Sequence, residues 1–205
     1  MKRFTAIAAV CALAAGCAGL SDAELSRQAA DVMRASFKER GQAKLDRLNQ
    51  DDPQATCSFD DGKMPSKEVQ HKLETAQRAM LKFPADGKLL GDWRAGERIA
   101  QTGVGKQFSD DPATPAGGNC YACHQISREE ISFGTIGPSL LGYGKVRGNS
   151  EAIQQYTYSK IWNAQAYNAC SNMPRFGHND ILTEQQIKDV TALLLDPASP
   201  VNKQE

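Results

Sequence analysis

The sequence predicts an all-α fold. Apolar residues return at intervals of three and four positions in several segments of the 205-residue chain, and Gly and Pro residues separate those segments. No segment of useful length alternates apolar and polar residues, as a half-buried β-strand does. Because hydrophobic residues make up 40% of the chain, it can build a packed core. We expect one domain with a sizeable extension, or two small domains.

A short apolar run opens the chain. Lys2 and Arg3 precede "FTAIAAVCALAAGC", and a basic start before a short apolar core is typical of an export signal. We therefore predict that residues 1–17 are a signal peptide and that the mature protein works outside the cytoplasm. "LAAGC" resembles a lipoprotein cleavage site, which would leave Cys17 lipidated, although Ala14 replaces the usual branched aliphatic residue. Ordinary cleavage within "AGCAGLSDA" is the alternative, and only a lipid on Cys17 would bring the protein to a membrane.

Residues 18–88 are expected to form a helical extension. The first helix starts at Ser21, weakens at Gly41 and stops at "DDP", residues 51–53. The second covers 66–83 and ends at Pro84. Their apolar stripes are Leu25, Val32, Met33 and Phe37 in the first helix, and Val69, Leu73, Met80 and Leu81 in the second. These stripes must be buried somewhere.

Residues 89–205 are expected to form a domain that is complete without the extension. Short helices are predicted over 92–103 and 151–168, and the segment "GTIGPSLLGYGKVRGN" between them is expected to be irregular. The last helix carries a capping box, Thr183 with Gln186 three residues later, and "DP" at 196–197 stops it.

The motif Cys120-Tyr-Ala-Cys123-His124 admits three chemistries: a redox dithiol, half of a zinc site, or attachment of haem c. A redox dithiol usually follows a strand in an α/β fold, but a Gly-rich loop precedes Cys120. Zinc needs four ligands, and the chain has no second CxxC pair; Cys170 and His178 are only distant candidates. Both alternatives leave part of the motif unexplained.

One covalently attached haem c accounts for every residue of the motif. Two thiols, Cys120 and Cys123, bond to the two vinyl groups of haem, and His124 lies on the same helical face as Cys120 to reach the iron. The export signal agrees, because haem c is attached outside the cytoplasm. The motif and its context therefore predict a haem c protein.

Met173 in "NMPRFG" is the predicted second axial ligand of the iron. Pro174 fixes the backbone directly after it, and a loop between two helices can carry the sulfur across the haem. A thioether ligand raises the haem potential, as suits an electron carrier. The alternatives are that Met173 is a core methionine and that His178 is the ligand. His71 lies on a charged helix and is expected to be exposed.

"CYACH", "GTIGPSLLGYG", "YNACSNMPRFG" and "LTEQQIKDVTALLLDPASPVN" together resemble class I cytochromes c. More narrowly, they resemble SoxX, the monohaem subunit of the SoxAX complex of sulfur oxidation, over roughly residues 90–202. The resemblance implies a class I cytochrome c fold for 89–205. It also implies that the Pro138 carbonyl accepts the second N–H of the axial histidine, and that Gly96 meets Leu193 and Leu194 where the terminal helices cross.

The resemblance further implies a periplasmic electron-transfer subunit of L-cysteine S-thiosulfotransferase. It would accept electrons from a SoxA-like haem subunit, where thiosulfate is joined to a cysteine of a carrier protein, and pass them to a soluble cytochrome c. The sequence shows no nucleophile–base or acid pair, so no catalytic residue of its own is expected. Equal numbers of basic and acidic residues, 24 each, argue against nucleic acid as a partner. The alternatives are a free-standing monohaem carrier serving a respiratory oxidase and a zinc-bound interaction module.

Cys57 and Cys170 remain after the haem motif and the signal peptide are set aside. In an oxidising compartment such a pair is predicted to form a disulfide. The alternative is that Cys170 is a reactive thiol close to the haem.

Overall fold

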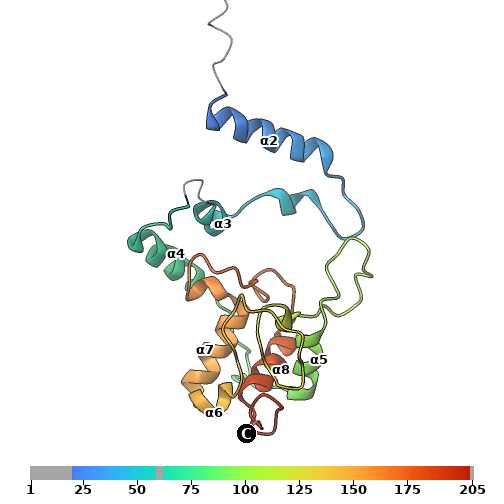
Figure 1. Ribbon diagram of the computed structural model, residues 1–205, viewed down its shortest axis with the longest axis vertical. Helices are drawn as coiled ribbons and strands as arrows, with labels where there is room; N and C mark the ends of the chain where they lie inside the picture. The colour runs from blue at the N-terminus through green and yellow to red at the C-terminus, as the bar shows by residue number, and fades with distance from the viewer. Residues whose placement is uncertain (1–19, 59–61, 204–205) are drawn as a thin grey trace, which may run out of the picture. The chain divides into compact units, whose positions relative to one another are not determined.

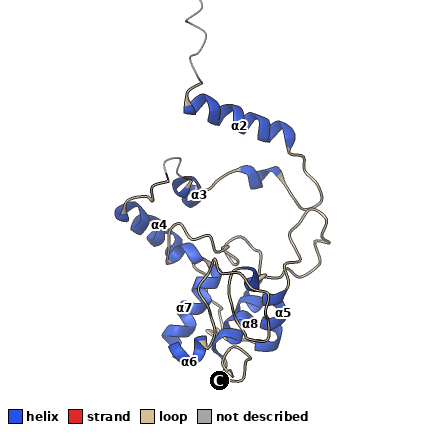
Figure 2. Ribbon diagram, in the orientation of Figure 1, coloured by secondary structure: helices blue, strands red, loops and turns tan. Residues whose placement is uncertain are grey.

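The computed structural model describes residues 20–58 and 62–203 (Figure 1). Over these residues the regular structure is helical and no β-strand occurs (Figure 2). The prediction of an all-α fold is therefore confirmed. The α-helices are α2 (Asp22–Ser36), α3 (Asp52–Cys57), α4 (Lys67–Ala79), α5 (Trp93–Gln101), α6 (Tyr143–Arg147), α7 (Glu151–Trp162) and α8 (Glu184–Leu195), and the 3-10 helices are η2 (Leu45–Leu48), η3 (Cys120–Ala122) and η4 (Ala164–Ala166). Of the described helices, none has the length and apolar character that a bilayer span requires.

The chain divides into two compact units. The first ends at Glu39 and also holds Lys44–Leu48, while the second holds Arg40–Ala43 and the chain from Asn49 onward. The second unit thus begins well before residue 89, where the sequence placed the domain boundary. The residues expected to form the helical extension are thus divided between the two units, with residues 49–88 in the second.

The first unit consists mainly of α2. Ser21 caps the helix and forms the capping box with Glu24. The helix ends at Ser36, five residues before Gly41, and none of its residues is buried. Val32 in the apolar stripe is 63% exposed. The stripe is therefore not buried within the first unit.

Helix α3 begins at the residues that were expected only to stop a helix. The Asp51 side chain accepts a hydrogen bond from the Gln54 backbone N–H at 3.1 Å. Pro53 lies in the first turn, where a missing N–H costs nothing because the first four N–H groups of a helix have no partner within it. "DDP" is therefore a helix start, and the sequence analysis missed it.

Helices α6 and α7 also differ from the prediction. The glycine-rich segment expected to be irregular contains α6, which starts after Gly142 in the left-handed conformation, with φ of +63°. The helix expected over 151–168 ends at Trp162, because the Asn163 side chain accepts the Gln165 N–H at 3.1 Å and starts η4. Polar side chains that bond to nearby backbone compete with helix continuation.

Helices α5 and α8 form the principal helix pair of the second unit. A Cβ atom at Gly96 would lie 2.1 Å from the backbone oxygen of Asp189. The crossing therefore lies at Asp189 and Val190, about one turn before Leu193 and Leu194, which are buried in the core instead. The capping box of α8, Thr183 with Gln186, is present as predicted.

Gly96→Ala is expected to lower the free energy of unfolding by about 1–3 kcal/mol, because the new methyl group meets backbone that cannot move aside. Urea unfolding of the haem-loaded protein measures the change. Arg98→Ala, at an exposed position of the same helix, is the control and should shift the value by less than ~0.5 kcal/mol. Equal stabilities for the two variants would contradict the close crossing.

Candidate functional site

An apolar cavity lies inside the second unit, and three of the predicted site residues line it together. Cys120, His124 and Met173 contribute sulfur and nitrogen atoms to an otherwise hydrocarbon surface. The other lining residues come largely from α5, α7, α8 and the loops: Ala100, Ile126, Leu140, Ile161, Phe176, Leu182, Val190, Leu193 and Leu194. A lining of this kind suits a large, flat, mostly apolar group with few polar anchors.

The backbone of the motif forms a single tight turn. The Cys123 and His124 N–H groups both donate to the Cys120 carbonyl, at 3.1 and 2.9 Å. Asn119 enters the turn in the left-handed conformation, with φ of +45°. Cys120 and His124 line the cavity, whereas Cys123 is half-buried beside it. Neither cysteine of the motif is in a disulfide, so both sulfurs are available for thioether bonds.

The ring of His124 is oriented by the loop that passes over it. His124 Nδ1 lies 2.7 Å from the Pro138 carbonyl oxygen. Since a carbonyl only accepts, Nδ1 carries the hydrogen and Nε2 is left free to bind a metal. A Cβ atom at Gly137 would lie 2.1 Å from Cε1 of the ring, so only glycine allows this approach. The structure thus places Pro138 at the second nitrogen of His124.

The electrostatics of the cavity favour neutral groups. Burial raises the pKa of the Cys120 thiol to about 12. A thioether in its place is also uncharged and apolar, so the cavity suits the attached form of the sulfur. Next in the chain, the buried Tyr121 hydroxyl lies 3.1 Å from Ser127 Oγ, and burial raises its pKa as well. The motif therefore meets the demands of covalent haem attachment.

Met173 and His178 occupy different places. Met173 lines the cavity with His124. The His178 ring instead packs edge-on against Trp162, with centroids 5.9 Å apart, and burial followed by the Arg175 charge lowers its pKa. His71 is exposed on α4, as expected. Of the two candidates for the second axial ligand, only Met173 is among the residues that line the cavity with His124.

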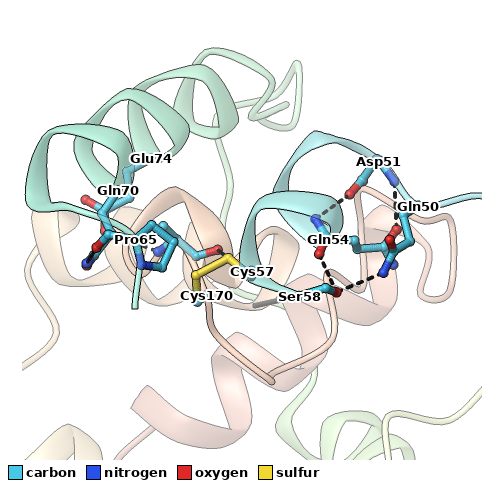
Figure 3. The surroundings of a disulfide bond; sticks show 10 residues. Gln50, Asp51, Gln54, Cys57, Ser58, Pro65, Gln70, Glu74 and Cys170 are labelled. Carbon is cyan, nitrogen blue, oxygen red and sulfur yellow. Dashed lines mark hydrogen bonds between the residues drawn. A yellow bond between two sulfur atoms is a disulfide. The ribbon is translucent and has the colours of Figure 1, made fainter. Parts of the chain in front are cut away.

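Cys57 and Cys170 are joined in a disulfide, with Cα atoms 5.4 Å apart (Figure 3). The bond links the end of α3 to the segment just before Met173. It also leaves Cys170 unavailable as a reactive thiol or a zinc ligand. Within the described chain, no three His, Cys, Asp or Glu side chains gather as a zinc site requires. Cys17, the candidate for lipidation, lies outside the described residues.

Sequence reasoning missed Arg175, two residues after Met173. Its side chain is buried and pairs with Asp51, the capping residue of α3. It also donates to Gln77 of α4. The one local signal was a charged residue between Pro174 and Phe176, in a run that is otherwise apolar after Met173. Nothing in the sequence indicates its partners.

The cytochrome c family profile matches residues 95–196. These residues belong to the cytochrome c family. An uncharacterized lipoprotein of Aquifex aeolicus (strain VF5) is 42% identical over 129 residues, which are 62% of this chain and 60% of that protein. The chain therefore spans less than two thirds of that relative's length. The match agrees with the predicted all-α cytochrome c fold and supports haem electron transfer.

The residues of the cytochrome c domain fit haem c. Bound haem supplies an iron that gains and loses one electron. Cys120 and Cys123 would hold it covalently, His124 would bind the iron through Nε2, and Met173 would be its second ligand. Pro138 holds the His124 tautomer and ring angle, which tunes the metal. The apolar lining would limit the access of water to the bound haem, which also affects its potential.

Proposed function

We propose that this protein is the monohaem electron-transfer subunit of a periplasmic sulfur-oxidation complex of the SoxAX type. The observation that carries the proposal is the run "YNACSNMPRFG", which resembles SoxX and supplies Met173 to the cavity that Cys120 and His124 also line. A cytochrome c domain alone is common to many carriers. The residues around the second ligand are the more specific feature.

The proposed reaction releases electrons that this subunit removes. Joining the terminal sulfur of thiosulfate to a carrier-protein cysteine forms one sulfur–sulfur bond and releases one proton and two electrons. The bond forms at the haem of a SoxA-like partner, so this chain needs no catalytic residue of its own. Since one haem takes one electron at a time, the subunit must discharge to a soluble cytochrome c twice for each thiosulfate.

Absorbance at the haem bands tests this function. The haem-loaded chain is mixed with its SoxA-like partner, the carrier protein and thiosulfate, and reduction of its haem is followed. Reduction should require all three components and should cease when the carrier cysteine is replaced by serine. Reduction by a respiratory donor with no response to thiosulfate would instead favour a free-standing carrier serving an oxidase.

The protein is also proposed to be lipid-anchored through Cys17. "LAAGC" and the name of the Aquifex relative both support this. Mass spectrometry should find a mature chain that starts at a lipidated Cys17, and fractionation should find it with membranes. Cys17→Ser should release the haem protein into the periplasmic fraction. A mature N-terminus beyond residue 17 would exclude the anchor.

A further inference from the structure

Residues of α3 and α4 are bonded to the segment that carries Met173. Before Met173, the disulfide joins Cys170 to Cys57. The Ala169 N–H donates to Glu74 Oε1 at 3.2 Å. A third contact runs from Arg78 Nη2 to the Ala166 carbonyl at 2.8 Å. All of these partners lie in residues 49–81, before the first helix of the cytochrome c domain.

The backbone hydrogen bonds of Ser171 and Met173 themselves are local. The Ser171 N–H donates to the Asn168 carbonyl at 3.1 Å, and the Met173 N–H donates to Ser171 Oγ at 3.2 Å. Bonds of this kind shape the loop but do not fix its distance from the haem motif. Its position therefore depends on the anchors on either side.

Two anchors follow Met173: the Gly177 and His178 N–H groups, which donate to the Trp162 carbonyl at 3.0 and 3.1 Å, and Arg175. The Arg175 side chain is 6% exposed and pairs with Asp51, whose side chain is 39% exposed. Arg175 Nη1 also lies 3.4 Å from Gln77 Oε1, which accepts a second bond from Asn163 Nδ2 at 2.9 Å. A buried guanidinium that loses its carboxylate is strongly destabilised in place and moves toward water. Pro174, with its fixed φ, would transmit that movement to Met173.

We propose that Arg175 is a positioning residue for the axial sulfur, held in place by Asp51 and Gln77. The Asp51–Arg175 ion pair stabilises the bond between the Met173 sulfur and the haem iron. Residues 49–81 therefore influence this bond, although they lie outside residues 95–196, which match the cytochrome c profile. This rests on the proposed role of Met173 as ligand.

Asp51→Asn is the test variant, because asparagine still accepts from the Gln54 N–H as a helix cap but lacks the charge. Asp86→Asn is the matched control. Asp86 pairs with Lys188, and the side chains of that pair are 52% and 10% exposed, similar to those of Asp51 and Arg175. Its partner, Lys188, lies on α8 and not in the segment that carries Met173. Arg175→Lys keeps a positive charge but loses the planar guanidinium group that bonds to both Asp51 and Gln77.

Two measurements report on the sulfur–iron bond: the sulfur-to-iron absorption band of the oxidised protein and the dissociation constant of imidazole, which competes with methionine for the iron. Asp51→Asn should weaken the band and tighten imidazole binding about tenfold, as expected when a buried charge loses its partner. Arg175→Lys should change both in the same direction. Asp86→Asn should leave imidazole binding within about twofold.

The proposal is overturned if Asp51→Asn and Arg175→Lys match Asp86→Asn in both measurements, even where their unfolding temperatures fall. Met173→Ala separates this failure from a failure of the ligand assignment. If Met173→Ala abolishes the band and Asp51→Asn leaves it unchanged, only the positioning role is wrong. If Met173→Ala keeps the band, Met173 is not the ligand and the positioning role falls with it.

Discussion

Replacing Cys120 and Cys123 together by serine is expected to abolish covalent haem and to unfold the cytochrome c domain. The cavity between the helices is lined by hydrocarbon, and without haem these side chains lose their principal contact surface. A domain of this kind has only about 5–15 kcal/mol of stability to lose. Haem content after purification and far-UV circular dichroism measure the two losses.

The matched control for that variant is the double serine replacement of Cys57 and Cys170. It removes the same number of thiols but breaks the disulfide instead. We expect it to retain haem and to lose about 2–5 kcal/mol of stability. A folded, haem-free protein from the Cys120→Ser/Cys123→Ser variant would contradict the view that the helices of the domain pack on haem.

Met173→Ala is expected to keep the covalent haem and to lose the sulfur-to-iron band of the oxidised state. The reduction potential should fall by ~0.1–0.3 V, a part of the ~0.8 V range that axial ligands span. Spectroelectrochemical titration measures both effects. Met80→Ala is the control, because Met80 is exposed at the end of α4. If His178→Ala produces these changes and Met173→Ala does not, His178 is the ligand.

The parts of the site that the sequence predicted are those with local signals. Haem attachment requires the spacing of Cys120, Cys123 and His124, and a single helical turn provides the geometry. The capping box of α8 is equally local, since Thr183 and Gln186 are three positions apart and each side chain accepts a hydrogen bond from the other's backbone N–H. Such features depend mainly on residues that are close together in the sequence, so the sequence alone can predict them.

The parts that the sequence could not predict depend on distant partners. Arg175 and Asp51 are 124 positions apart, and no spacing rule connects them. Likewise "DDP" can end one helix or begin the next, and the sequence does not indicate that its Asp51 pairs with the distant Arg175. The boundary expected at residue 89 followed the extent of the resemblance to cytochromes c, and a resemblance does not indicate that residues 49–88 contact the unit with the haem motif.

The disulfide imposes a constraint on how the protein is made. Of the cysteines in the described chain, Cys57 and Cys170 must be oxidised, whereas Cys120 and Cys123 must meet haem as thiols. Both pairs emerge into the same compartment, where a free thiolate can attack any accessible disulfide. Any maturation route must therefore keep the haem pair reduced until attachment. Thioether bonds then withdraw those two sulfurs from exchange permanently, after which Cys57 and Cys170 have only each other to pair with among these four.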